Sequence, residues 1–388
     1  MKYLLAVALI VFLHAGAQAQ SDKPKYENFS VPGAVTLPIP GSYQLSGTFV
    51  QDLNDSGHIV GYYTNESSVP TRGFERKPNG EIVLLDDPGA GTPVSDGPPT
   101  SAITDPYAIN NAGVIVGWFA TPNTTTEAFL FDPAGTFDNF FAPADSFYTQ
   151  AFAINAAGTI TGRTGIYNPN LYTTLTYGLI LTTDGNTITF QSPSATTTGV
   201  INGTTSIAIN RTGATTGYYY DTNSTYHSYI RSAKGEFNEF EVPGAGTASY
   251  TGALPMEITD SGDVLGFYAD NNFVSHSYLR LADGTFAEIN LPERAGAEVF
   301  FEWINQKGDI AGTYSDANGA YHAFVRLKDG RCFFFTDPEA GAGASQGTVP
   351  IRINDRGEVA GYYLDVNNVY HGFLWTPAQQ AHRGNDGE

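Results

Sequence analysis

Four histidines occupy equivalent positions in a recurring short aromatic segment, and if they converged they could act as metal ligands or acid–base groups. They are His227, His276, His322 and His371. A catalytic group is normally singular, whereas one histidine in each of several similar units spreads these side chains apart. We therefore expect a structural role, in which each histidine bonds the Asp of the preceding turn and stabilises its own unit. The Asp residues of these turns are Asp221, Asp270, Asp316 and Asp365.

Other acidic residues could bind cations or transfer protons. The turns that begin at Asp221, Asp316 and Asp365 offer several oxygen ligands for calcium, but turn geometry alone favours the same residue types, so we interpret them as turns. Glu257 and Glu302 could be the acid and base of a carbohydrate lyase or hydrolase if they lie about 5–10 Å apart in a cleft. No His or Cys spacing matches a zinc site or a redox pair, so neither a metal nor a cofactor is expected.

The chain repeats the motif Ile-Asn-x-x-Gly-x-x-x-Gly seven times, at intervals of about 50 residues. The copies begin at Leu53, Ile109, Ile154, Ile209, Ile258, Ile304 and Ile353. Only the fifth copy lacks the Asn, which Thr259 replaces. Internal repetition with this period is typical of propellers and of repeat arrays.

Each copy contains signals for four strands. Asn-x-x-Gly predicts a tight hairpin turn, because Asn bonds nearby backbone and Gly accepts a positive φ. The second glycine predicts a bulge or a close approach of two backbones. A polar turn, an aromatic strand and a last strand that ends in proline follow, as in residues 237–243. A four-stranded meander with a longer connection to the next meander is typical of a propeller blade.

The two ends of the chain complete one unit. YENFSVPGA, from Tyr26, is a last strand without its preceding strands, and the C-terminal copy stops at YHGFLWTP without a last strand. An open array would need capping units and would leave a bare sheet edge. The sequence therefore predicts an all-β, seven-bladed β-propeller of four-stranded antiparallel blades, closed by pairing of its N- and C-terminal strands. A different seven-unit β array is the alternative.

Departures from the repeat indicate a candidate binding site. The residue before the Ile or Leu of the hairpin motif is Ala in three copies. In the other four copies it is Asp52, Glu257, Trp303 and Arg352. If this strand is innermost, these side chains face the mouth of a central channel, where propellers bind ligands. The alternative is that they occupy ordinary solvated positions.

The N-terminus predicts export. An apolar run from Tyr3 to Leu13 precedes Ala17-Gln18-Ala19, the pattern of a signal peptide, and is about half as long as the roughly 20 residues of a membrane-spanning helix. We expect residues 1–19 to be the signal peptide, residues 20–377 the propeller and residues 378–388 a disordered polar tail. The protein is then secreted, either extracellular or periplasmic.

The formal net charge of −20 argues against nucleic acid or an anionic membrane surface as a partner. Solubility alone is a sufficient reason for such a charge. The single cysteine, Cys332, cannot form an internal disulfide, so packing must hold the fold together. We expect a monomer.

The aromatic segments resemble those of the HAF-repeat family of secreted bacterial proteins. The tripeptide His-Ala-Phe is present at His322–Phe324, and the near forms HSY and HGF stand in three other copies, each after a hairpin motif. The resemblance covers about residues 26–377. The first three copies depart from it, with Arg72, Glu127 and Tyr177 in place of His. It implies an extracellular location and a repeat architecture. The family has no established catalytic activity, so the resemblance does not supply a function.

No nucleophile motif, metal spacing or phosphate-binding loop is present in the sequence. We therefore expect a secreted, non-catalytic binding or scaffold protein that recognises a glycan, a peptide or an exported protein through one propeller face. The alternative is a propeller carbohydrate lyase or hydrolase that uses loop carboxylates.

Overall fold

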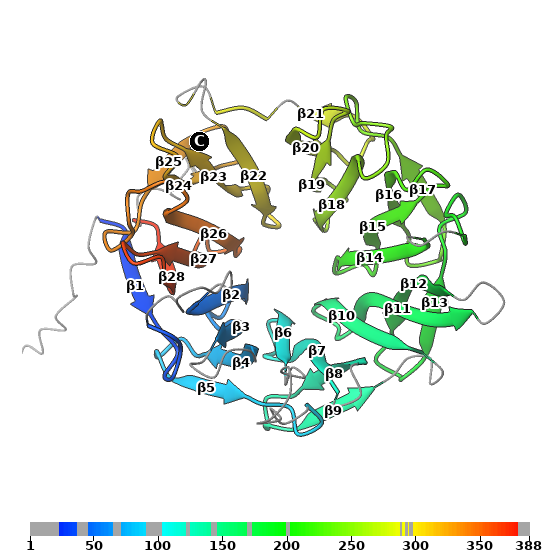
Figure 1. The fold of residues 1–388 in the computed structure, drawn as a ribbon, viewed down its shortest axis with the longest axis horizontal. Helices are drawn as coiled ribbons and strands as arrows, with labels where there is room; N and C mark the ends of the chain where they lie inside the picture. The colour runs from blue at the N-terminus through cyan, green and yellow to red at the C-terminus, as the bar shows by residue number, and fades with distance from the viewer. Residues whose placement is uncertain are drawn as a thin grey trace, which may run out of the picture.

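The computed structural model describes residues 23–36, 46–64, 71–90, 103–121, 125–140, 146–168, 173–198, 202–287, 289–291, 294 and 298–378. Within these ranges the protein is all-β, with 28 strands and no α-helix (Figure 1). The predicted signal peptide, residues 1–19, and residues 379–388 of the predicted tail lie outside the described residues. In the part of the chain that is described, no helix is long and apolar enough to cross a membrane.

The strands pair antiparallel in sets of four, arranged around a common centre with one strand of each set innermost (Figure 1). The innermost strands are β2 (Thr48–Leu53), β6 (Thr104–Ile109), β10 (Tyr148–Ile154), β14 (Thr204–Ile209), β18 (Gly252–Ile258), β22 (Val299–Ile304) and β26 (Gly347–Ile353). The second strands are β3 (Ile59–Thr64), β7 (Ile115–Ala120), β11 (Ile160–Asn168), β15 (Thr215–Tyr220), β19 (Val264–Ala269), β23 (Ile310–Ser315) and β27 (Val359–Leu364).

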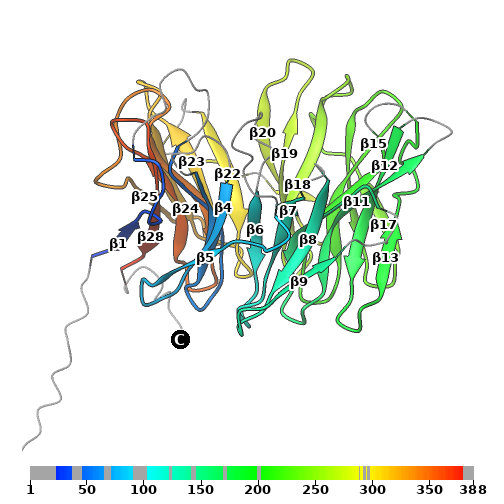
Figure 2. The same cartoon turned by 60° about the horizontal axis from the view of Figure 1, so that its bottom comes forward.

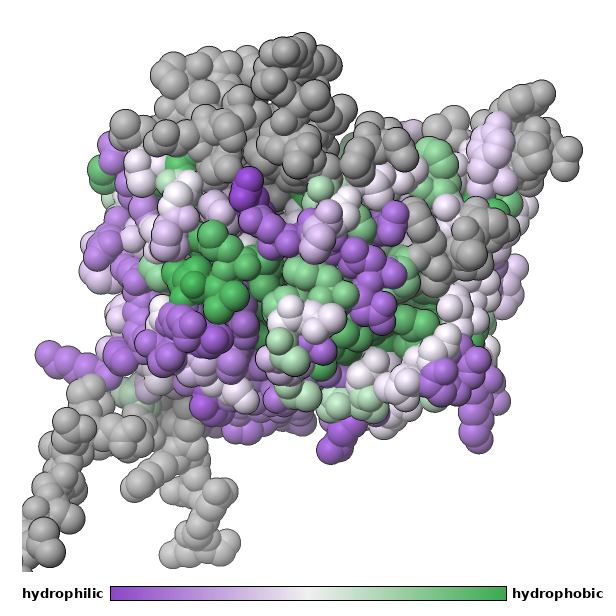
Figure 3. Space-filling model, turned by 90° about the horizontal axis from the view of Figure 1, so that it is seen from below, coloured by the Kyte–Doolittle hydropathy of each residue, from purple (hydrophilic) through white to green (hydrophobic). Residues whose placement is uncertain are grey.

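The third strands carry the aromatic tripeptides, and the fourth strands form the outer rim. The third strands are β4 (Thr71–Arg76), β8 (Thr126–Phe131), β12 (Thr173–Leu181), β16 (Tyr226–Arg231), β20 (Ser275–Arg280), β24 (Tyr321–Arg326) and β28 (Tyr370–Thr376). The outer strands are β5 (Ile82–Leu85), β9 (Phe137–Phe140), β13 (Thr187–Phe190), β17 (Phe237–Phe240), β21 (Phe286–Ala287), β25 (Cys332–Phe335) and β1 (Lys25–Phe29). Figure 3 views part of this rim, where hydrophobic patches alternate with hydrophilic side chains.

The sheets are open. One is the four-stranded set β2–β5, and each of the other three joins two sets into eight strands through a single parallel residue pair, such as Tyr148 with Thr126. The N-terminal strand β1 pairs antiparallel with the C-terminal strand β28, from Lys25 opposite Thr376 to Phe29 opposite Gly372. The predicted pairing of the two chain ends is therefore present.

Connections gather at the two ends of the strands, which define two faces of the molecule (Figure 2). We call the face with the Asn-x-x-Gly turns the hairpin face. Because the strands of a set alternate in direction, the polar turns that begin at Asp221, Asp270, Asp316 and Asp365 lie on the opposite face, which we call the turn face.

The second glycine of the motif and the aromatic tripeptide are two parts of one packing arrangement. A Cβ at Gly61 would lie 2.0 Å from the carbonyl oxygen of Phe49, and it would also meet the ring of Phe74 at 3.1 Å. Phe74 is fully buried, as is Phe324 of the His-Ala-Phe tripeptide, which packs on Gly312 in the same way. At six of the seven motif glycines, all but Gly162, the aromatic side chain of the tripeptide occupies the space that glycine leaves open.

The innermost strands carry a β-bulge opposite this glycine, as predicted. In β2 the pairing with β3 shifts between Val50 and Asp52, and every other innermost strand shifts at the equivalent place. A bulge changes the direction in which the following side chains point. The candidate residue Asp52 directly follows the bulge.

Candidate functional site

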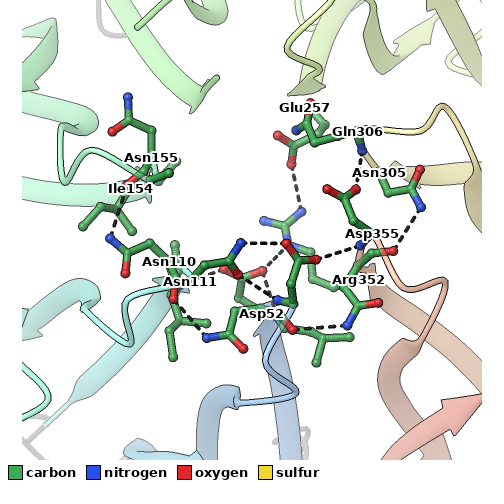
Figure 4. A pocket seen from close by; sticks show the side chains of 18 of the residues that line it. Asp52, Asn110, Asn111, Ile154, Asn155, Glu257, Asn305, Gln306, Arg352 and Asp355 are labelled. Carbon is green, nitrogen blue, oxygen red and sulfur yellow. Dashed lines mark hydrogen bonds and ion pairs between the residues drawn. The ribbon is translucent and has the colours of Figure 1, made fainter. Parts of the chain in front are cut away.

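The four predicted site residues meet, although they come from four different innermost strands. Arg352 on β26 donates from Nε to Asp52 Oδ1 on β2 at 2.9 Å, and its Nη1 lies 3.4 Å from Glu257 Oε2 on β18. The guanidinium carbon lies 3.8 Å from the ring centroid of Trp303 on β22. One arginine therefore joins two carboxylates (Figure 4) and also stacks on an indole.

These residues line a cavity of about 430 Å³ at the hairpin face, which we call the mouth. The rest of its lining comes mainly from the Ile, Asn and following residue of the hairpin motifs. The alternative expectation, that the four side chains occupy ordinary solvated positions, is wrong for Asp52 and Arg352, whose side chains are only 14% and 15% exposed.

The asparagines of the motif form an interrupted circle of hydrogen bonds around the mouth. Each Oδ1 accepts from two backbone N–H groups of its own turn, as Asn54 does from Ser56 and His58. Each Nδ2 donates to the backbone carbonyl of the equivalent residue in the next set. These bonds run from Asn54 to Asn110, to Asn155, to Asn210 and to Thr259, and from Asn305 to Asn354 and on to Asn54, at 3.0–3.2 Å. Sequence reasoning had identified these asparagines as turn residues alone.

The asparagine circle is structural and is not available to a ligand. Its members are buried, and both ends of each amide already have partners, as at Asn54. Thr259 interrupts the circle, since its hydroxyl accepts from Asp263 N–H but offers no amide to Asn305. The side chains left for a ligand are therefore those of the residues that come before and after the asparagines in the hairpin motifs.

The residue after the Asn or Thr of each hairpin motif lines the rim of the mouth, and in three copies it is an aspartate: Asp55, Asp260 and Asp355. Asp55 Oδ1 accepts from the backbone N–H of Asp355, and Asp355 Oδ1 accepts from that of Gln306, each at 2.8 Å. Burial raises the pKa of Asp355, and the nearby carboxylates Asp55 and Asp260 raise it further. Arg211 pairs with Asp260 at 3.1 Å. The sequence did not identify this rim, because the residues share no type.

The two carboxylates beside Arg352 differ in their bonding. Asp52 also accepts from the backbone N–H groups of Leu53 and Ile109, at 2.9 and 2.8 Å. Glu257 has only long contacts, 3.4 Å to Arg352 and 3.4 Å from Ile258 N–H. Burial raises the pKa of Glu257 to about 7, an effect that Arg352 opposes and Asp52 reinforces. Glu257 is thus the carboxyl that a ligand can most readily engage.

Two further carboxyls on innermost strands have pKa values that burial raises. Burial raises the pKa of Glu302 on β22 to about 8, and its Oε2 accepts from Thr313 Oγ1 at 3.2 Å. Burial raises the pKa of Asp105 on β6 to about 7, although Gln51 donates to it at 3.4 Å. Among the described residues that line the mouth, Glu257 is present and Glu302 is not. Sequence reasoning missed Asp105, which stands in an otherwise unremarked strand.

The four repeated histidines contact the turns as predicted. Nε2 of His227, His276, His322 and His371 lies 3.4, 3.6, 3.5 and 3.5 Å from Oδ2 of Asp221, Asp270, Asp316 and Asp365, respectively. Each ring also stacks on a tyrosine of the second strand, at centroid distances of 4.9–5.1 Å. These tyrosines are Tyr219, Tyr268, Tyr314 and Tyr363.

One of these histidines has the partners of a hydrolytic triad. Ser30 Oγ lies 2.8 Å from His371 Nδ1, and Asp365 lies on the other ring nitrogen. His322 has the same arrangement with Thr336 at 2.7 Å, so a hydroxyl, a histidine and an aspartate recur together. Recurrence in two sets indicates a structural contact between strands rather than a nucleophile.

The turn aspartates are occupied by backbone groups, in agreement with their interpretation as turns. Asp221 Oδ1 accepts from Asn223 N–H and Thr225 N–H at 2.8 and 2.9 Å. Across the described ranges, no cluster of three His, Cys, Asp or Glu side chains is placed to hold a metal ion.

Comparison with known proteins bears on the fold alone. No family model matches this chain, and no curated protein is similar to it in sequence. Among solved structures it is similar to the acylaminoacyl peptidase of Pyrococcus horikoshii, with 10% identity and a TM-score of 0.50 over 84% of this chain and 51% of the peptidase. This chain thus spans about half the length of the peptidase.

Two lectins are similar at lower TM-scores. A Burkholderia pseudomallei lectin gives 0.41 with 11% identity over 79% of this chain and 94% of the lectin. The six-bladed β-propeller lectin of Aleuria aurantia gives 0.37 with 9% identity over 93% of this chain and 94% of the lectin. The class that the fold defines is an all-β protein of propeller-like architecture. The resemblance to the HAF-repeat family stays a prediction.

Proposed function

We propose that this chain is a secreted, non-catalytic binding protein of the HAF-repeat type, a seven-bladed propeller that recognises its ligand at the mouth. The seven hairpin motifs support this blade count, as does β1, which supplies the outer strand to β26, β27 and β28. The bond from Asn354 to Asn54, which links the last copy to the first, supports ring closure.

The observation that carries the binding proposal is the contact of Arg352 with Asp52, Glu257 and Trp303. These side chains stand at a position where the other copies have Ala, so the repeat itself does not require them. They converge from four strands on one cavity, and a cavity of about 430 Å³ lies within the range of small-ligand sites.

The mouth suits a polar ligand group. Carboxylates accept hydrogen bonds, the guanidinium donates them, and the indole supplies an apolar surface beside both. A sugar residue of a glycan or a polar side chain of a peptide or exported protein fits this combination. Because the asparagines are already bonded, specificity falls to Glu257, Trp303, Arg352 and the rim carboxylates.

A binding screen tests the proposal. The mature chain is titrated calorimetrically with cell-wall oligosaccharides and with peptides, and each ligand found is retested on Arg352→Met and Trp303→Leu. We expect both variants to lose at least about tenfold in affinity, since each removes a contact worth about 1.4 kcal/mol or more. Arg356→Met is the matched control, because Arg356 pairs with Glu358 on the same face and is not among the described residues that line the mouth.

Ligand turnover by the parent would overturn the non-catalytic proposal. If both mouth variants bound the ligand with unchanged affinity, the binding site would have to lie outside the mouth. Melting curves of all variants establish that they fold.

A hydrolase or lyase is the second candidate, favoured by one observation. The pKa values of Glu257 and Glu302 are raised by burial to about 7 and about 8, so each carboxyl can hold a proton near neutral pH, as a general acid must. The partners oppose this role, because Glu257 lies against Arg352 and Glu302 accepts from Thr313. Turnover in the screen that Glu257→Gln abolishes would support the enzyme.

A further inference from the structure

Two aromatic residues on the turn face have a backbone conformation that disfavours them. Tyr250 and Phe273 have φ values of 64° and 62°, in the left-handed region, where a bulky side chain is an outlier. The C-terminal copy has Ser345 and Asn368 at these positions, with φ of 64° and 61°. The chain therefore tolerates small polar residues at both places, and folding gives no reason for aromatic ones.

The same backbone hydrogen bonds establish the equivalence of these positions. Tyr250 N–H donates to the Ser224 carbonyl as Ser345 N–H does to that of Gly319. Phe273 N–H closes its turn on Asp270, as Asn368 N–H does on Asp365. The turn at Asp221 has Ser224 in this place, and the turn at Asp316 has Gly319. Phe273 is the large residue in a set of small ones.

These aromatic side chains point into solvent instead of the core. Tyr250 is 56% exposed, Phe273 63% and the adjacent Val274 50%. Thr247 and Ala248, in the loop before Tyr250, both donate backbone N–H groups to Asn271 Oδ1, in the turn that holds Phe273. The loop and the turn are thus fixed to one another. We call Tyr250, Phe273 and Val274 the aromatic corner. Phe273 and Val274 lie in the connection between β19 and β20, and Tyr250 lies in the loop that leads into β18. Figure 2 shows these three strands.

The segment around the aromatic corner lacks basic residues: between Lys234 and Arg280 the sequence contains no Lys or Arg. Of the acidic residues in this segment, Glu257 and Asp260 line the mouth on the opposite face. Three acidic side chains lie on the turn face, where Asp221 and Glu241 flank His227 and Asp270 lies beside His276. An apolar surface in such a field attracts a partner that is both apolar and positively charged.

We propose that the aromatic corner is a docking surface for a polypeptide segment of a partner protein that presents apolar side chains flanked by Lys or Arg. Tyr250 and Phe273 are the anchors, because exposed aromatic side chains on a rigid backbone contribute most to such interfaces. The surrounding carboxylates select the basic flanks. This site lies on the face opposite the mouth and is independent of any ligand bound there.

The test uses two variants taken from the protein's own repeat, Tyr250→Ser and Phe273→Asn. The probe is a 12-residue peptide of alternating Lys and Phe or Leu, with a Glu-for-Lys peptide as its counterpart, both titrated at physiological salt. We expect the Lys peptide alone to bind the parent, and each variant to lose about tenfold or more in affinity. Because Asn adopts the left-handed region more readily than Phe, Phe273→Asn is expected to melt about 1–4 °C higher than the parent.

Val366→Asn is the matched control, since Val366 is 73% exposed in the equivalent turn of the C-terminal copy and lies outside the aromatic corner. It should bind the Lys peptide as the parent does. Equal affinity of parent and corner variants, or equal binding of the Lys and Glu peptides, would overturn the proposal. If oligosaccharides of the mouth screen lost affinity in the corner variants while the peptide did not bind, the surface would be a glycan site instead.

Discussion

His322 illustrates how one side chain can serve three contacts at once. Its ring stacks on Tyr314, with centroids 5.1 Å apart, and its two nitrogens face Thr336 and Asp316. These partners come from the second strand, the outer connection and the preceding turn. The histidine therefore adds side-chain contacts between three parts of its set, two of which, β23 and β24, are already paired at Tyr314 and His322.

Removing this ring should destabilise the protein without affecting function. We expect His322→Ala to lower the free energy of unfolding by about 1–2 kcal/mol. His276→Ala should cost less, about 0.5–1 kcal/mol, because the His276 side chain is 41% exposed against 23% for His322, and its contact with Asp270 is 3.6 Å. Denaturant unfolding of both variants measures the difference. A large effect of a chelator on the parent would instead indicate a shared metal.

Glu302 makes stability depend on pH in a direction opposite to that of a salt-bridged carboxylate. Burial raises its pKa to about 8, above the ordinary value of 4.5, so the folded state holds this proton more tightly than the unfolded state. Its contribution is full below pH 4.5 and is lost as pH rises through about 8. The Gln of Glu302→Gln cannot ionise. The free energy of unfolding of this variant relative to the parent should therefore be about 1–3 kcal/mol higher at pH 9 than at pH 5.

Unfolding curves at several pH values provide the measurement for this prediction. The control is Glu236→Gln, at the exposed turn before β17, which should follow the parent. A parent and a Glu302→Gln variant with parallel pH profiles would contradict the assigned burial of this carboxyl.

At the scale of the element, the Asn hairpin both closes its own turn and contacts the next set. The Oδ1 contacts follow from local geometry, which is why the sequence predicted the turn. The Nδ2 contacts depend on the distance between neighbouring hairpins. This distance is set by the tertiary arrangement, so a local sequence pattern could not predict these contacts. The interruption at Thr259 offers a direct measure of what one such contact contributes.

Thr259→Asn should complete the asparagine circle. The new Oδ1 would replace the hydroxyl that accepts from Asp263 N–H, and the new Nδ2 would donate to the Asn305 carbonyl, as its equivalents do. We expect a gain of about 0.5–1.5 kcal/mol in the free energy of unfolding. Asn210→Thr, which removes the preceding contact, should lose at least as much. No change in either variant would mean that the contacts between sets contribute nothing.

Much of the fold and part of the site could be predicted from particular residues. The glycine and asparagine spacings predicted the strands, and the register of His322 and its equivalents predicted their Asp partners. Asp52, Glu257, Trp303 and Arg352 stood out because they replace alanine. Their meeting through one guanidinium could not be predicted, because it depends on the bulge and on bringing together strands 300 residues apart, as between Asp52 and Arg352. The aromatic corner could not be predicted either, because the φ angles of Tyr250 and Phe273 cannot be derived from the sequence.

At the scale of the whole molecule, β1 contacts both of its neighbours. Besides pairing with β28, it places Glu27 Oε2 2.8 Å from Arg76 Nη2 on β4, and Phe29 stacks edge-on against Phe74 at 6.0 Å. Asn28 Nδ2 donates to Asp337 Oδ1 at 3.0 Å, in the connection after β25. The N-terminal strand thus joins the first set, the last set and the one before it.

Deleting residues 20–34 should therefore lower the free energy of unfolding by far more than the length of the segment suggests. The deletion exposes the edge of β28 and leaves the Arg76 guanidinium, whose side chain is 5% exposed, without Glu27. A buried charge that loses its partner costs about 3–5 kcal/mol. We expect a loss of that size or more, together with concentration-dependent aggregation. Deletion of residues 379–388 is the control, because it removes no described contact.

The same deletion distinguishes a closed ring from an open array. In a ring, the first set still packs beside the last set after the deletion, so the edge of β28 stays formed. A synthetic peptide of residues 23–36 added in trans should then pair with this edge and restore most of the lost melting temperature. A peptide in which Glu27 is Gln should restore less, because Arg76 stays unpaired. In an open array the terminal set would unfold locally, both truncations would melt alike, and the peptide would have no formed edge to pair with.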